Sequence, residues 1–172
     1  EAMRAVASTR YPPHGRRAMT TMSRASRYCT DCDYLTTADQ GLAVIAQLET
    51  ASALERAEAI AAVPGIDALF IGPADLAASL GHTGQLLHPA VVDAMAQAAR
   101  RIKAAGKPVG AIGATPEAVA TYRAVGFDFI ALMSDMGLLM RGAHEAIGLL
   151  RGGGPAPSVH TLADGTRTES AA

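Results

Sequence analysis

Short apolar runs alternate four times with helical segments along this chain of 172 residues. The apolar runs are residues 42–48, 67–71, 108–112 and 127–133. They are nearly continuous, which is typical of strands whose two faces are both covered. Because parallel strands need a crossover connection, usually a helix, this regular alternation predicts a parallel sheet. The sequence therefore predicts an α/β fold.

The helical segments are recognised by their ends. Thr50 is a candidate N-cap, Pro89 and Pro116 stand in first turns, and Gly81 and Gly126 follow last turns. These signals predict helices at residues 51–62, 74–80, 89–105, 116–125 and 136–150. Weaker patterns predict a helix that ends near residue 8 and short helices at 20–28 and 33–40.

Four strand–helix units suit half of an eight-stranded barrel or a small open sheet. No Gly-x-Gly-x-x-Gly or Gly-x-x-x-x-Gly-Lys-Ser/Thr motif follows a predicted strand. The sequence therefore lacks the phosphate-binding loop that is typical of nucleotide-binding open sheets. The segment 151–172 contains Gly-Gly-Gly-Pro-Ala-Pro and has no hydrophobic periodicity. We predict that this segment is a disordered tail.

Composition argues against two classes of partner. The formal net charge is −1, and aromatic residues make up 4% of the chain with no Trp. A nearly neutral chain is only weakly attracted to nucleic acid or an anionic membrane, and few aromatic rings are available to stack on bases. No apolar run approaches the roughly 18 residues of a membrane-spanning helix, and no signal-peptide core is present. We expect a cytoplasmic protein with no nucleic-acid and no membrane partner.

Two polar side chains stand where the first predicted strand ends. Gln47 and Glu49 are two residues apart, so they point to the same face of the sheet. In parallel α/β folds the carboxyl ends of the strands carry the functional groups. Polar groups on an otherwise apolar strand are costly if unpaired, so they usually serve a ligand, a metal or a hydrogen-bond network. The alternative is that Glu49 is a surface carboxylate that stabilises the start of the next helix.

The second predicted strand is followed by Gly72, Pro73, Ala74 and Asp75. Gly72 allows close approach of the backbone, and the free N–H groups of Ala74 and Asp75 would attract an anion such as a substrate carboxylate. Asp75 as a simple helix cap is the alternative. Because Glu49 and Asp75 end successive strands, we expect their carboxylates at one edge of the sheet. Two such oxygen ligands with open positions suit Mg²⁺ or Mn²⁺.

The cysteines and histidines carry weaker signals. Cys29 and Cys32 have no second pair to complete a zinc site and follow no predicted strand, so we interpret them as incidental. We interpret His88, which precedes Pro89, as a helix cap. His14 lies in a loop and is not assigned a role.

A resemblance to a known family rests on two segments. Residues 47–50 (Gln-Leu-Glu-Thr) and 63–76 (Val-Pro-Gly-Ile-Asp-Ala-Leu-Phe-Ile-Gly-Pro-Ala-Asp-Leu) together resemble the HpcH/HpaI aldolase family. The resemblance runs over residues 1–150. It implies a TIM (β/α)8 barrel of the phosphoenolpyruvate/pyruvate type, of which only about the last four βα units are present. It also implies a homo-oligomer, often a hexamer that exchanges a C-terminal helix.

The resemblance further implies a metal-dependent class II aldolase. Such an enzyme cleaves a 4-hydroxy-2-oxo acid to pyruvate and an aldehyde through a metal-stabilised enolate. By this resemblance Glu49 and Asp75 bind the divalent cation, which would be Mg²⁺, Mn²⁺ or Co²⁺. Gln47, Ala74 and Asp75 would hold the 2-oxo acid. The family's base histidine and its arginine have no counterpart here and are expected upstream of residue 1, so no catalytic residue is assigned.

Two alternatives keep the same carboxylates. One is an acyl-CoA lyase similar to the citrate-lyase β proteins, which would need a basic surface for CoA that the sequence does not contain. The other is a truncated homologue without catalysis that binds metal or forms oligomers.

Overall fold

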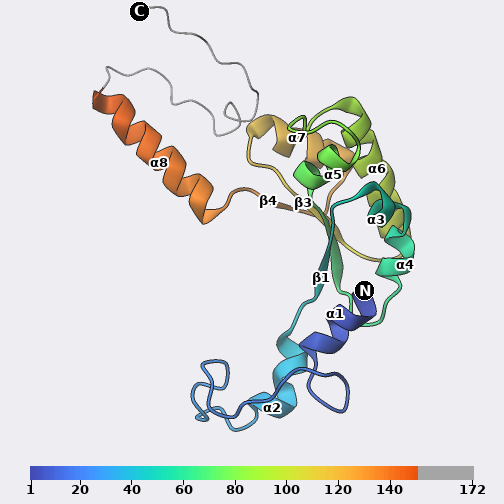
Figure 1. The fold of residues 1–172 in the computed structure, drawn as a ribbon, viewed down its shortest axis with the longest axis vertical. Coiled ribbons are helices and arrows are strands. Elements are labelled where there is room, and N and C mark those ends of the chain that lie inside the picture. The colour runs from blue at the N-terminus through green and yellow to red at the C-terminus, as the bar shows by residue number, and fades with distance from the viewer. Residues whose placement is uncertain (151–172) are drawn as a thin grey trace, which may run out of the picture.

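The computed structural model describes residues 1–150, and the predicted tail at 151–172 lies outside the described residues. Four parallel strands form one sheet in the order β1-β2-β3-β4. They are β1 (Ile45–Leu48), β2 (Ala68–Ile71), β3 (Val109–Ile112) and β4 (Phe129–Ala131). Strands that follow one another in the chain thus lie side by side in space (Figure 1). The predicted α/β fold with a parallel sheet is confirmed.

The helices follow the signals at their ends. They are α1 (Ala2–Thr9), α2 (Tyr34–Thr37), α3 (Ala51–Glu55), α4 (Ala57–Ala61), α5 (Pro73–Ser79), α6 (Pro89–Ala104), α7 (Pro116–Val125) and α8 (Asp135–Leu150), with a 3-10 turn η1 (Ala38–Gly41). The Thr50 hydroxyl accepts the Ala53 N–H at 3.1 Å and caps α3. Gly126 ends α7 with φ +94°, a left-handed angle that favours glycine.

The predicted helix at 20–28 is wrong. These residues form turns, and Arg27, Tyr28 and Cys29 all have positive φ. The Ser26 hydroxyl donates to the carbonyls of Thr21 and Ser23, at 2.7 and 3.1 Å. Serine and threonine side chains in this segment satisfy backbone groups locally, which competes with the helical hydrogen-bond ladder.

Two other boundaries differ from the sequence pattern. The first strand begins at Ile45 rather than at residue 42, because the Asp67 carboxylate accepts the Val44 N–H at 2.7 Å before the strand ladder starts. The predicted helix at 51–62 is divided into α3 and α4 at Arg56, whose N–H bonds to the Ala53 carbonyl three residues back.

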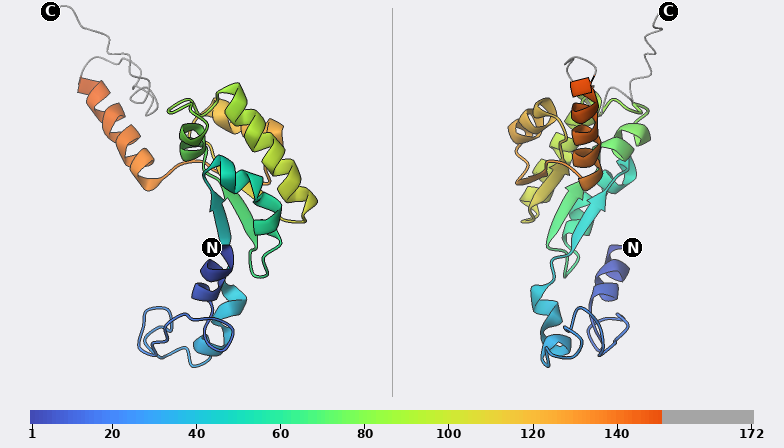
Figure 2. Two further views of the ribbon diagram at one scale, coloured as in Figure 1. Left: turned by 45° about the vertical axis from the view of Figure 1, so that its right-hand side comes forward. Right: turned by 90° about the vertical axis from the view of Figure 1, so that its left-hand side faces the viewer.

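The core lies between one face of the sheet and helices α3 to α7. Figures 1 and 2 show these helices gathered on one side of the strands. Apolar residues of strands and helices are almost fully buried there, including Leu48, Leu69, Ile71, Leu76, Met95, Ile102 and Val109. Each such side chain contributes roughly 1.5–3 kcal/mol when it is removed from water. This packing fixes the sheet and thereby the positions of the loops at the ends of its strands.

Carboxylates hold the opposite, amino-terminal ends of the strands. Asp67, just before β2, bonds the Val44 N–H, and Asp128, just before β4, accepts the Val109 N–H at 2.9 Å. The hydrogen bond from the Val109 N–H, together with Lys103 at 3.0 Å, holds the pKa of Asp128 below its usual range. A carboxylate thus links β1 to β2 and another links β3 to β4 in the same way. These contacts do not involve the carboxyl ends of the strands.

The second face of the sheet carries Gln47, Phe70, Gly110 and Phe129 in one row, as the strand register requires. The Phe70 and Phe129 rings lie 6.0 Å apart, and the Phe129 ring covers Gly110. Within residues 1–150 the helices that form the core do not cover this face, and Ile45 on it is 50% exposed. In the described part of the chain, the sheet thus has its core-forming helices on one side.

Helix α8 projects away from the sheet in Figure 1 and in the left view of Figure 2. None of its residues is buried, and it exposes large apolar side chains, including Met136, Leu138, Leu139, Ile147 and Leu149. Across the described residues, no helix combines the length and the apolar character that crossing a membrane requires.

Candidate functional site

Gln47 and Glu49 meet at the carboxyl end of β1. The Gln47 Nε2 group donates to Glu49 Oε1 at 2.7 Å. Gln47 is exposed and Glu49 is half-buried. The predicted placement of the two side chains on one face is therefore confirmed, and a hydrogen bond between them orients the carboxylate.

Gly72 forms the floor beneath these two side chains. A Cβ atom at Gly72 would lie 3.0 Å from Glu49 Cγ and 3.1 Å from Gln47 Nε2. Its φ of −85° is open to any residue, so the close approach and not the backbone angle requires glycine here. The Gly72 N–H also donates to the Leu48 carbonyl at 3.0 Å, which joins the ends of β1 and β2.

Ala74 and Asp75 follow in the first turn of α5. Gly72 is the N-cap residue of α5 and Pro73 occupies its first position, so Asp75 is not the cap that the alternative reading of this residue requires. Ala74 and Asp75 are both exposed. Because β1 pairs directly with β2, the structure brings Gln47, Glu49, Ala74 and Asp75 to one edge of the sheet.

These residues fit a hard divalent cation in the number and type of their donors. Within residues 1–150 no group of three or more His, Cys, Asp or Glu side chains is arranged to hold a metal. Mg²⁺ is commonly bound through one or two carboxylates, with water and substrate oxygens completing its shell. Two carboxylates, one of them kept in place by an amide over a glycine floor, match that mode of binding.

A substitution at Gly72 tests this geometry. We expect Gly72→Ala to weaken Mn²⁺ binding several-fold, because the added methyl group pushes Glu49 and Gln47 from their positions. The free energy of unfolding should change by less than about 1 kcal/mol, since an ordinary φ is kept. Calorimetric titration with Mn²⁺ and urea unfolding measure the two effects. Gly41→Ala, at a position outside the left-handed region where a Cβ meets nothing within 4 Å, serves as the comparison for a glycine change away from the floor.

The histidines and cysteines are placed away from this edge or in structural roles. His88 Nδ1 accepts the Ala90 N–H at 3.2 Å, which confirms its role as the cap of α6. Its ring stacks on His82 with centroids 3.6 Å apart. Cys29 and Cys32 are exposed and are not joined to each other, and the Cys29 thiol donates to the Thr21 carbonyl.

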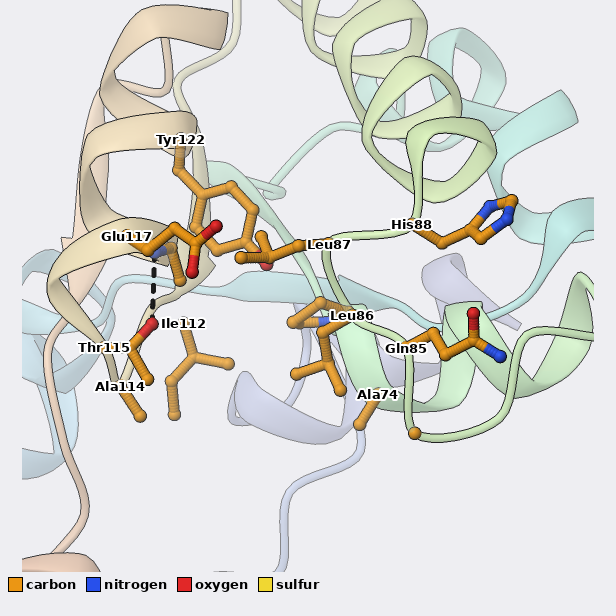
Figure 3. Close-up of a pocket in the computed structure, with 13 residues that line it drawn as sticks. Ala74, Gln85, Leu86, Leu87, His88, Ile112, Ala114, Thr115, Glu117 and Tyr122 are labelled. Atoms are coloured by element: carbon orange, nitrogen blue, oxygen red, sulfur yellow. Dashed lines mark hydrogen bonds between the residues drawn. The ribbon is translucent and has the colours of Figure 1, made fainter. Parts of the chain in front are cut away.

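A cavity of about 600 Å³ opens next to Ala74, between the start of α5, the loop at 84–88 and helix α7. Figure 3 shows Leu86 and Leu87 on one side of it and Ile112 on the other. The sequence did not predict this cavity, because its walls come from segments that only the fold brings together. The apolar pair Leu86-Leu87 in a loop was the single visible signal.

The parallel sheet and the polar groups at its carboxyl edge are features of α/β enzymes. The model of the family described as HpcH/HpaI aldolase/citrate lyase matches residues 1–142. The chain is 44% identical over 152 residues to a 2-dehydro-3,6-dideoxy-6-sulfogluconate aldolase of Pseudomonas putida, which covers 88% of this chain and 60% of that protein. It is 47% identical over 145 residues to a pyruvate aldolase of Rhizobium etli, which covers 83% of this chain and 56% of that protein.

A solved structure agrees with these relatives. An HpcH/HpaI aldolase/citrate lyase family protein from Burkholderia cenocepacia superposes with a TM-score of 0.78 at 42% identity, over 87% of this chain and 60% of that chain. The chain belongs to the HpcH/HpaI aldolase/citrate lyase family. It spans about 60% of the length of these relatives.

Proposed function

We propose that this chain contributes the metal- and pyruvate-binding part of a class II aldolase that cleaves a 4-hydroxy-2-oxo acid to pyruvate and an aldehyde. The observation that carries the proposal is the meeting of Gln47 and Glu49 over Gly72, next to the exposed first turn of α5. Homologues named as pyruvate aldolases support the reaction class. The barrel of eight strands, of which this chain would supply the last four, belongs to the same proposal.

The residues of this chain have binding and positioning roles in the proposed reaction. Glu49 and Asp75 would hold the divalent cation, and Gln47 and the Ala74 N–H would hold the 2-oxo acid. A cation bound at this place would supply Lewis-acid stabilisation of the negative charge that develops on the keto oxygen. Gln47 keeps the Glu49 carboxylate oriented through its 2.7 Å hydrogen bond. The proton transfers are assigned to none of the described residues.

Pyruvate release from a 4-hydroxy-2-oxo acid, with and without EDTA, tests the proposal on the protein that carries this chain. Lactate dehydrogenase and NADH report the pyruvate. We expect EDTA to abolish release and Mg²⁺, Mn²⁺ or Co²⁺ to restore it. Release that persists in EDTA contradicts the metal-dependent reaction. Release of thiol from a hydroxyacyl-CoA would favour the acyl-CoA lyase instead, and metal binding without turnover of either substrate would favour a non-catalytic homologue.

We also infer that the chain assembles into a homo-oligomer through α8. The exposed apolar side chains on this helix support the inference, since burying them against a second copy removes them from water. Leu139→Asp combined with Ile147→Asp should lower the mass of the assembly measured by light scattering. Glu145→Lys on the same helix is the control for a change of charge. An unchanged mass in the double variant contradicts the role of α8.

A further inference from the structure

We propose that the cavity between α5 and α7 binds the aldehyde half of the substrate, and that this half is an uncharged, apolar group bearing a hydrogen-bond acceptor. The inference rests on the proposed function, because it extends the same site. The cavity begins at Pro73 and Ala74, which directly follow the Gly72 floor beneath Glu49. A substrate held at Glu49 and Ala74 therefore has this space beside it.

The size and lining of the cavity indicate that the aldehyde half is apolar. Its volume of about 600 Å³ lies within the range of small-molecule sites. Leu86, Leu87 and Ile112 contribute apolar surface from the loop and from β3 (Figure 3). Ala118 adds apolar surface from α7. Such walls favour an aromatic ring or a branched aliphatic chain, because contact with them removes apolar surface from water.

Tyr122 indicates that the aldehyde half carries a hydrogen-bond acceptor. Its side chain is 1% exposed, lines the cavity from α7, and extends toward Leu87 in Figure 3. Its hydroxyl oxygen is buried and has no hydrogen-bond partner among the described residues. Burial raises the pKa of Tyr122 to about 12, so the hydroxyl keeps its proton and can donate it in a hydrogen bond. A buried donor without an acceptor is costly, and an ether, hydroxyl or carbonyl oxygen of a ligand would satisfy it.

The charges around the cavity indicate that the aldehyde half is uncharged. Among residues 1–150 no Lys or Arg side chain lines it, and the acidic side chain there is Glu117. His88 uses Nδ1 to cap α6 and is not free to offer that nitrogen as a donor. From the described part of the chain, a carboxylate, sulfonate or phosphate on the distal end of the aldehyde would meet a carboxylate and apolar walls without a Lys or Arg. The cavity therefore selects against anionic aldehydes.

Two probes of the same shape test the charge and the acceptor together. Benzamide is uncharged and offers a carbonyl oxygen, whereas benzoate carries a carboxylate on the same ring. We expect benzamide to shift the methyl NMR signals of Leu86, Leu87 and Ile112, and benzoate to bind at least tenfold more weakly. Equal binding of the two probes, or benzamide binding that leaves these methyl signals unmoved, overturns the inference.

Tyr122→Phe isolates the hydroxyl. We expect this variant to bind benzamide about fivefold more weakly, as for the loss of one neutral hydrogen bond. The midpoint of urea unfolding of the free protein should not fall, because the lost hydroxyl bonds to none of the residues that the structure describes. Tyr28→Phe, at a tyrosine that is 63% exposed, is the matched control and should leave benzamide binding unchanged. Unchanged affinity in Tyr122→Phe overturns the role of the hydroxyl.

A second variant fills the space without touching the hydroxyl. Ala118 is 8% exposed and lines the cavity, so Ala118→Leu should place its added carbons in the volume that benzamide occupies. We expect benzamide binding to fall by at least tenfold. Full benzamide affinity in this variant would mean that the probe binds elsewhere, which contradicts the inference.

Mn²⁺ separates this inference from the proposed function. With Mn²⁺ and benzamide both bound, we expect paramagnetic broadening of the benzamide signals, and the broadening should be lost in Glu49→Gln. Benzamide in the cavity without broadening, while Mn²⁺ remains bound, overturns the inference and leaves the proposed function standing. Failure of Mn²⁺ to bind at all contradicts the proposed function, whereas the benzamide shifts still report the cavity.

Discussion

Glu49→Gln should weaken Mn²⁺ binding by at least about tenfold, which corresponds to about 1.4 kcal/mol. The substitution keeps the shape of the side chain and removes its charge, and a hard cation binds a carboxylate far better than an amide. The Gln47 Nε2 group that now donates to Glu49 can still find the amide oxygen, so the local structure should persist. Calorimetric or paramagnetic titration with Mn²⁺ measures the loss.

The comparison variants make this result specific. Asp75→Asn should cause a loss of similar size, because the proposal gives both carboxylates to one cation. Glu55→Gln, an exposed carboxylate on α3, removes the same charge from another place and should leave the affinity within about twofold. If Glu49→Gln and Asp75→Asn both retain the affinity of the unaltered protein, this edge of the sheet is not the metal site.

Gly110→Val is expected to lower the free energy of unfolding by about 1–3 kcal/mol, as for overpacking of a filled site. Valine is a better strand former than glycine, but that preference spans only about 1 kcal/mol. A side chain at Gly110 would enter the space of the Phe129 ring and displace it from its contact with Phe70. Steric conflict therefore outweighs strand propensity.

Urea unfolding measures this loss against a matched substitution. Ala131→Val adds a larger side chain on the same face of the neighbouring strand, at an exposed position. It should change the free energy of unfolding by less than about 0.5 kcal/mol. A Gly110→Val protein as stable as the parent would show that the Phe129 ring moves aside without cost, contrary to the packing described above.

The parts of the fold that sequence predicted are those decided by local chemistry. The Thr50 and His88 caps, the prolines at the start of α6 and α7, and Gly126 after α7 each act within a few residues, so spacing alone indicated them. The helix predicted at residues 20–28 was wrong for the complementary reason. In this segment the hydrogen bonds of a helix compete with those from the Ser26 hydroxyl to nearby carbonyls. Composition does not show which of the two conformations is more stable.

The candidate site divides in the same way. Period-two alternation placed Gln47 and Glu49 on one face, and successive strands suggested that Asp75 would come to the same edge. The distance that makes Gly72 a floor could not be predicted, because it depends on how closely β1 and β2 approach. The cavity was also out of reach, since Leu86, Ile112 and Tyr122 belong to three elements and meet only after packing.

By itself, the sequence determined the order of strands and helices, the parallel class of the sheet and the polar residues that end its strands. These follow from side-chain periodicity and end signals, which act over a few residues. Tertiary structure alone decided that one face of the sheet is packed while the other carries Phe70 and Phe129. It also decided that the Tyr122 hydroxyl is buried without a partner within residues 1–150. Burial and unmet hydrogen bonds are properties of three-dimensional neighbours, so they exist only once distant segments have come together.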